Sequence, residues 1–131
     1  MVDFHHKTVL ITGGAGFIGS TLVRKLLEEP GAEVAVIDNF LTGKRSNLDE
    51  VSAQVDLQDA DIRNYDRIAP ILRGADVVYH LAAIPSVPRS IHEPVPSHEV
   101  NIDGTFNVLR ACAEGNAGKV IFAASSSAYG D

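Results

Sequence analysis

Three glycines near the N-terminus have the spacing of a phosphate-binding loop. Gly13, Gly16 and Gly19 directly follow the apolar run 8–12. A glycine at the first position permits a sharp turn, one at the second lets the backbone approach a diphosphate, and one at the third lets the next helix pack closely on the sheet. Unpaired N–H groups at the start of that helix attract phosphates. The pattern therefore predicts a dinucleotide-binding loop at residues 13–19, named the glycine loop below.

A carboxylate ends the next apolar run. Asp38 follows the run 33–37 and lies about 20 residues after the glycine loop. There a carboxylate accepts hydrogen bonds from ribose hydroxyls and repels a ribose 2′-phosphate, which favours NAD over NADP as the cofactor. Lys44 or Arg45 would weaken this repulsion if the following loop folds back. The alternative interpretation of Asp38 is a turn residue beside Asn39 that ends the strand and contacts no ligand.

Short β-branched runs predict the strands that position these groups. The expected strands are 8–12, 33–37, 53–57, 76–80 and 119–124. A loop rich in turn formers is expected after Asp38. Segments of helical periodicity separate the strands, so that parallel strands with right-handed crossovers are predicted. The expected fold class is α/β, a doubly wound parallel Rossmann sheet of about five strands in the order 3-2-1-4-5.

Three helices are predicted between these strands. One begins near Ile18 and one covers residues 65–72. In a third, long helix, Pro94 and Pro96 fit only near the start and Gly115 ends the segment. We expect its apolar face to consist of Ile102, Phe106, Leu109 and Ala113.

Composition excludes several classes of protein. The 131 residues, 45% of them hydrophobic, suit one domain, and the net charge of −6 gives no positive field for nucleic acid. The single cysteine, Cys112, excludes a disulfide framework, and we expect it to be buried without a metal. No apolar run approaches the roughly 20 residues that span a bilayer. We therefore expect a cytoplasmic protein that binds neither nucleic acid nor membrane nor metal.

The motifs, in this order, resemble the extended short-chain dehydrogenases/reductases, whose glycine spacing is Gly-x-x-Gly-x-x-Gly. Within them the chain is most similar to the NAD-dependent epimerase/dehydratase family, in particular to its UDP-glucose and UDP-N-acetylglucosamine 4-epimerases. The resemblance runs from Lys7 to Asp131. The segments that carry it are 12–20, 38–40, 61–62, 80–83, 86–90, 101–105 and 125–131.

The resemblance implies which residues bind NAD. Phe17 and Ile18 would line the diphosphate, residues 38–43 would surround the adenosine, and Asp61 and Ile62 would flank the adenine. Small residues after the fourth strand would let the backbone approach the cofactor. The alternative interpretation is that they are small because the strand and the following loop pack tightly. The expected NAD contacts are Gly13, Gly16, Phe17, Ile18, Gly19, Asp38, Asn39, Phe40, Thr42, Gly43, Asp61, Ile62, Leu81, Ala82, Ala83 and Asn101.

The resemblance also implies which serines contact the substrate. Ser86 begins a stretch similar to the sugar-contacting loop of 4-epimerases, or else a proline-stiffened surface loop. Ser125, four residues before Tyr129, stands where the family's catalytic serine or threonine hydrogen-bonds the reacting hydroxyl, and Ser126 would be a second sugar contact. Related 4,6-dehydratases carry Asp-Glu where this chain has Ser126 and Ser127. Serines are poor general acids and bases, which favours an epimerase or oxidoreductase over a dehydratase.

The family's base belongs to a Tyr-x-x-x-Lys pair, and no tyrosine of this chain has a lysine four residues later. We therefore expect residues 1–131 to be the N-terminal, NAD-binding part of an enzyme, truncated before the later strands and the substrate-binding domain and inactive alone. The full-length protein is expected to invert C4 of a UDP-hexose through a 4-keto intermediate, as a homodimer. Alternatives are an NAD-dependent nucleotide-sugar dehydratase, another extended-family dehydrogenase, and a non-catalytic dinucleotide-binding module.

Overall fold

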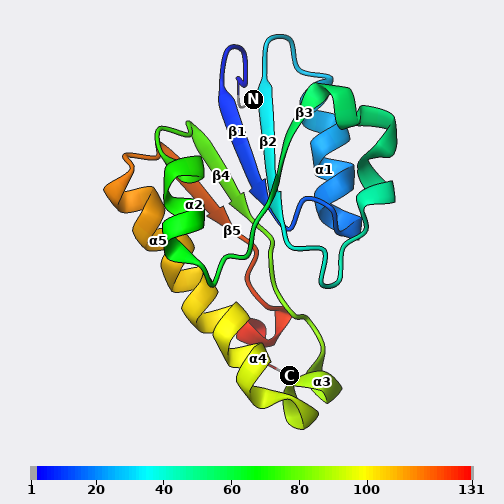
Figure 1. Cartoon of the computed structure of the whole chain (residues 1–131), viewed down its shortest axis with the longest axis vertical. Coiled ribbons are helices and arrows are strands. Elements are labelled where there is room, and N and C mark those ends of the chain that lie inside the picture. The colour runs from blue at the N-terminus through cyan, green and yellow to red at the C-terminus, as the bar shows by residue number, and fades with distance from the viewer. Residues whose placement is uncertain (1–2, 131) are drawn as a thin grey trace.

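The computed structural model describes residues 3–130, without the side chains of Ser126 and Ser127. Its strands form one parallel sheet in the order β3-β2-β1-β4-β5 (Figure 1). They are β1 (Thr8–Thr12), β2 (Glu33–Asp38), β3 (Val55–Asp59), β4 (Val77–His80) and β5 (Lys119–Phe122). The predicted fold class and strand order are confirmed.

β2 and β4 differ from their predicted bounds by one residue at one end, and two other strands differ by two residues. β3 begins and ends two residues later than predicted, because it pairs along β2 with Val34 opposite Val55 and Asp38 opposite Asp59. β5 ends at Phe122, opposite the last residue of β4, His80. In both cases the length of the neighbouring strand sets where the strand ends. Local residue preferences do not carry this information.

Helices cover both faces of the sheet (Figure 1). Side chains of α1 pack with Val9 and Ile11 of β1, and those of α2 and α5 pack with Leu10 on the other face. The helices are α1 (Phe17–Leu27), α2 (Tyr65–Leu72), α3 (Val87–His92), α4 (Pro94–His98) and α5 (Thr105–Glu114). A 3₁₀ segment (Arg45–Gln54) occupies much of the predicted loop after β2, and a π-helical turn (Glu99–Gly104) joins α4 to α5. Residues 87–90, which both interpretations of the stretch 86–90 expected to be a loop, form the first part of α3.

The apolar face predicted for the long helix is wrong. Ile102, Phe106 and Leu109 are exposed, whereas Val108 and Cys112 are buried against the sheet and α2. Two apolar stripes run along this segment, and periodicity alone does not say which one meets the sheet. Cys112 is buried as predicted, and burial raises the pKa of its thiol.

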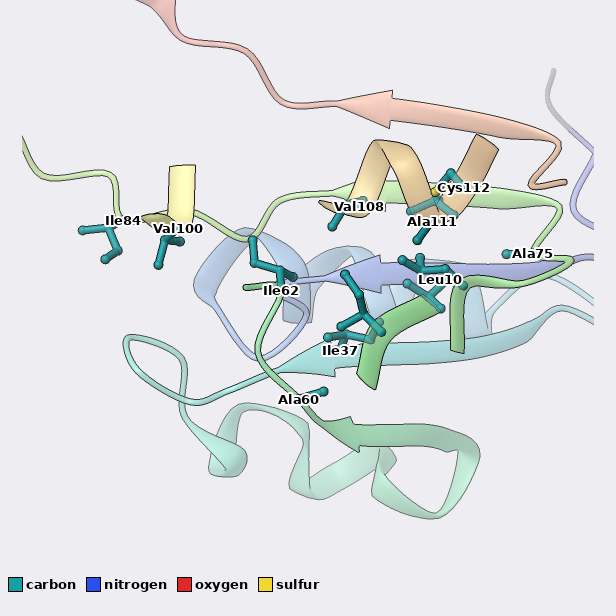
Figure 2. Close-up of a cluster of buried hydrophobic side chains, with 13 residues drawn as sticks. Leu10, Ile37, Ala60, Ile62, Ala75, Ile84, Val100, Val108, Ala111 and Cys112 are labelled. Carbon is teal, nitrogen blue, oxygen red and sulfur yellow. The ribbon is translucent and has the colours of Figure 1, made fainter. Parts of the chain in front are cut away.

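One core cluster continues past the carboxyl ends of the strands. Figure 2 shows Ile62, Ile84 and Val100 beyond the part of the cluster that contains Leu10 and Ile37. These three side chains come from the segments that follow β3 and β4 and from the π-helical turn, and they are buried. The core thereby supports the loops at that end of the sheet. Within residues 3–130, no helix combines the length and apolarity needed to cross a membrane.

Candidate functional site

A cavity of about 490 Å³ lies at the carboxyl ends of β1, β2 and β4. The strand order reverses between β1 and β4, and open parallel sheets bind their ligands in the crevice beyond such a reversal. Apart from Phe40 and Asn101, every residue predicted to contact NAD lines this cavity. Residues that are distant in the sequence therefore meet at one place.

Several further residues line the cavity that the motifs did not indicate. They are Ile37, Ala60, Ile84, Pro85, Val100, Ala123 and Ala124. All are apolar, so their residue types resemble ordinary core positions. Their position in the chain could have indicated them, because Ala60 follows β3 and Ala123 follows β5 at the same edge of the sheet.

The three glycines of the loop meet different steric demands. Gly13 has φ +75°, and a Cβ on it would lie 2.7 Å from the amide nitrogen of Ala82. A Cβ on Gly19 would lie 2.2 Å from the carbonyl oxygen of Gly13. A Cβ on Gly16 would meet only that same oxygen, at 3.3 Å. Gly13 and Gly19 are therefore required by the protein's own packing, whereas Gly16 keeps the cavity open.

The first turn of α1 faces the cavity with its backbone donors. Gly16 is the N-cap and offers no side-chain hydrogen bond to the helix. The first N–H groups of any α-helix have no partner within the helix, and they attract anions. Phe17 and Ile18, which carry two of these groups, line the cavity and are 88% and 69% exposed. The start of α1 is thus suited to a diphosphate.

Asp38 fastens the glycine loop to the end of β2. Asp38 is 7% exposed, and its carboxylate accepts hydrogen bonds from the N–H of Ala15 at 2.9 Å and of Phe40 at 2.8 Å. A carboxylate has about four acceptor positions, so it keeps capacity for hydroxyl donors in the cavity. The turn function and the ligand function that the sequence left as alternatives are therefore compatible.

The two cationic residues near Asp38 lie outside the cavity lining. Arg45 lies over the ring of Phe40, 4.0 Å from its centroid, and donates to the carboxylate of Asp59. The backbone N–H of Lys44 donates to the carbonyl of Ala15, and neither cation lines the cavity. Because Arg45 is already paired, it leaves the repulsion between Asp38 and a 2′-phosphate in place.

Asp61 forms a wall of the cavity as the centre of a polar network. Arg63 donates to both carboxylate oxygens, at 3.0 and 2.7 Å, and the amide of Asn39 donates to one at 2.9 Å. The hydrogen bonds from Arg63 are the main reason that the pKa of Asp61 is lowered to about 2. Arg63 also bonds Glu99 of the π-helical turn at 3.2 Å. The network fixes an ionised carboxylate at the cavity.

Asn101 acts on the cavity through the backbone. Its side-chain amide donates to the carbonyl of Ile84 at 3.1 Å and accepts from the N–H of Ile84 at 2.8 Å. Ile84 lines the cavity and Asn101 does not. The π-helical turn thereby holds the loop that follows β4.

Replacing Asn101 with leucine is expected to release this loop. The two lost hydrogen bonds leave the backbone of Ile84 without its partners, at a cost of about 1–3 kcal/mol. We expect faster hydrogen exchange of the Ile84 amide, measured by NMR, while amides of β1 keep wild-type rates. Unchanged exchange at Ile84 would show that other contacts hold the loop.

His80 is a buried residue whose contacts the sequence motifs did not reveal. It is 2% exposed, with Nδ1 2.6 Å from Oγ1 of Thr12 and Nε2 2.9 Å from Oγ1 of Thr105. Thr12 Oγ1 also accepts from the N–H of Ala82 at 3.3 Å. Burial lowers the pKa of His80 to about 4, so the ring is neutral near pH 7. A neutral imidazole thus joins β1, β4 and α5 beneath the cavity.

Two of the serines predicted to contact substrate, Ser86 and Ser125, lie outside the cavity lining. Ser86 is the N-cap of α3, where its hydroxyl accepts from the N–H of Arg89. Ser125 is exposed and directly follows Ala124, a cavity residue. The side chain of Ser126 lies outside the described part of the chain. The substrate roles of these serines stay predictions.

Comparisons with known proteins agree with this geometry. The NAD dependent epimerase/dehydratase family matches residues 9–131. A UDP-N-acetyl-alpha-D-glucosaminuronate decarboxylase of Bacillus cytotoxicus is 40% identical over 124 residues, which are 95% of this chain and 38% of that protein.

Solved structures give the same result. A UDP-N-acetylglucosamine 4-epimerase from Methanobrevibacter ruminantium, in complex with UDP-N-acetylmuramic acid, has a TM-score of 0.87 at 39% identity. The match covers 96% of this chain and 40% of that one. A UDP-glucose 4-epimerase from Thermus thermophilus, in complex with NAD, has a TM-score of 0.82 at 42% identity over 90% of this chain and 37% of that one. The chain thus spans about two fifths of the length of these proteins.

Proposed function

Because the chain belongs to the NAD-dependent epimerase/dehydratase family, we propose that it is the NAD-binding part of a nucleotide-sugar 4-epimerase. The whole enzyme would invert C4 of a UDP-hexose through a transient 4-keto sugar. The observation that carries the proposal is the cavity that joins the glycine loop, Asp38 and Asp61 at one edge of the sheet. A homodimer and a cytoplasmic location are further predictions from the sequence.

The residues around the cavity fit a dinucleotide. The start of α1 would hold the diphosphate, since Gly16 leaves room beside its backbone donors. Asp38 would accept the ribose hydroxyls with its remaining acceptor positions, and Asp61 would lie beside the adenine. When bound, NAD supplies a hydride acceptor and donor for the sugar. The chain's own residues bind and orient both reactants.

One feature favours epimerisation over dehydration. Ser126 and Ser127 replace the Asp-Glu pair of related dehydratases, and eliminating water needs an acid and a base at the sugar. In an epimerase, Ser125 would hydrogen-bond the C4 hydroxyl while the sugar is oxidised and reduced again.

A second candidate is the decarboxylation of a UDP-linked uronic acid. Relatives with this activity in their names are 40% and 37% identical to the chain. The first step is the same oxidation at C4, after which the carboxylate β to the new ketone leaves as CO₂ and its bonding electrons pass to C5. The choice depends on the sugar that the rest of the protein selects.

Binding and turnover test the proposal separately. Titration calorimetry of NAD into the chain is expected to give a one-to-one complex, and absence of binding would refute the cofactor assignment. For the longer protein that contains this chain, NMR of the products from UDP-glucose and UDP-glucuronic acid separates C4 inversion from CO₂ release. Stoichiometric NADH release would identify a dehydrogenase, and NAD binding without any turnover would identify a non-catalytic module.

Replacing Ser125 with alanine in that longer protein is expected to lower kcat roughly 100-fold, because one hydrogen bond to the reacting oxygen is lost. NAD affinity should be unchanged, as measured by calorimetry. Ser52→Ala, at an exposed serine of the 3₁₀ segment outside the cavity lining, is the control and should keep full activity. Wild-type turnover by Ser125→Ala would remove Ser125 from the catalytic residues.

A further inference from the structure

The turn after β2 contains a strained residue. Phe40 has φ +57°, a left-handed conformation that bulky side chains rarely adopt. Its N–H donates to Asp38, and the N–H of Leu41 donates to the side chain of Asn39 at 3.0 Å. Asp38, Asn39 and Leu41 line the cavity, whereas Phe40 does not. The strained conformation of Phe40 therefore sets the direction of residues that face the cavity on either side of it.

Arg45 covers this strained residue from outside the cavity. Its guanidinium lies 4.0 Å from the centroid of the Phe40 ring, and its other contact is an ion pair with Asp59. Asp59 ends β3 directly opposite Asp38 in the sheet register, so the ion pair ties the guanidinium to a fixed point of the fold. Phe40 also packs against the core cluster that contains residues of α1 and β2. Phe40 thus contacts both the core and Arg45.

We propose that Arg45 is a positioning residue for the adenosine part of NAD, acting through the ring of Phe40. Held by Asp59, the guanidinium stabilises the left-handed turn that presents Asn39 and Leu41 to the cavity. This inference rests on the proposed binding of NAD. It assigns Arg45 a function toward a ligand that its own side chain does not contact.

The size of the effect follows from the contacts. An exposed cation–π contact contributes about 0.5–1 kcal/mol, which corresponds to roughly a two- to fivefold change in a conformational equilibrium. Without Arg45, some of the molecules would adopt a turn conformation that does not bind the ligand. Ligand affinity would then fall in proportion to the fraction of molecules that keep the binding conformation. A glycine at position 40 adopts the left-handed conformation without strain, so the turn would then no longer depend on Arg45.

A double-mutant cycle tests the coupling. The affinity of ADP-ribose, which carries the adenosine and both phosphates, is measured by calorimetry for wild type, Arg45→Ala, Phe40→Gly and the double variant. We expect Arg45→Ala to weaken binding about two- to fivefold with Phe40 present and by less than about 1.5-fold in the Phe40→Gly background.

The chain offers a matched control. Arg110 lies 4.1 Å over the ring of Tyr65 and pairs with Glu114, and none of these residues lines the cavity. Arg110→Ala removes the same kinds of contact, so a loss that is only structural would lower Tm in both variants. ADP-ribose affinity should change only in Arg45→Ala. If Arg45→Ala does not fold, Arg45→Lys keeps the charge without the planar face and replaces it in the cycle.

The outcomes separate this inference from the proposed function. Equal losses of affinity in both backgrounds, or no loss in Arg45→Ala, would overturn the positioning function while leaving NAD binding in place. If the wild-type chain bound neither NAD nor ADP-ribose, both the positioning function of Arg45 and the proposed function would be overturned.

Discussion

Replacement of Gly16 with valine is expected to abolish measurable NAD binding while the chain keeps its fold. Gly16 has φ −75° and ψ 177°, which valine adopts readily, and a Cβ there has only the carbonyl of Gly13 nearby at 3.3 Å. The added methyl groups would occupy the space in which the diphosphate approaches the start of α1. We expect the dissociation constant for NAD to rise by roughly 100-fold or more, equivalent to about 2.7 kcal/mol. Calorimetry measures the affinity, and circular dichroism the fold.

Gly13→Ala is the contrasting variant for this experiment. Gly13 combines φ +75° with a close approach to the backbone of Ala82, so alanine there should disturb the contact between β1 and the loop after β4. We expect it to lower Tm as well as affinity. If a folded Gly16→Val chain bound NAD as wild type does, the diphosphate would not lie at the glycine loop.

The free energy of unfolding is expected to fall by roughly 3 kcal/mol between pH 7 and pH 4 because of His80. Burial lowers the pKa of His80 in the folded chain to about 4, from 6.5 as its ordinary value. The unfolded chain therefore binds a proton more readily within this interval, and acidification favours unfolding. The contribution is fully present above about pH 6.5 and is lost as the pH falls to about 4. Asp61, with a pKa of about 2, loses its contribution only below its ordinary value of 3.8.

Urea denaturation at a series of pH values, followed by circular dichroism, measures this dependence. His80→Gln keeps hydrogen-bonding groups between Thr12 and Thr105 but does not titrate. The variant should be less stable than wild type at pH 7 and should lose less stability between pH 7 and pH 4. A decline as steep as that of wild type would show that other groups cause it.

The sequence predicted those parts of the site that depend on short stretches of chain. Glycine spacing after an apolar run indicated the glycine loop, and Asp38 at the end of the next run indicated the adenosine side. Strand order followed from the alternation of strands and helices, because crossover connections are right-handed. The π-helical turn at 99–104 had no such signal, and the close approach of Gly104 to Ile62 and the hydrogen bonds of Asn101 with Ile84 join it to distant segments.

The amino-acid sequence by itself determined the parallel sheet, its strand order and the loop that faces a diphosphate, because residue types within a few positions of one another carry that information. Only the tertiary structure decided which stripe of α5 is buried, that Arg45 pairs with Asp59 and Phe40, and that His80 lies between two threonines. The physical reason is that these contacts join segments distant in the chain. The energies of these contacts depend on how closely the folded backbone brings the groups together. The distance between two such groups cannot be inferred from a local sequence pattern.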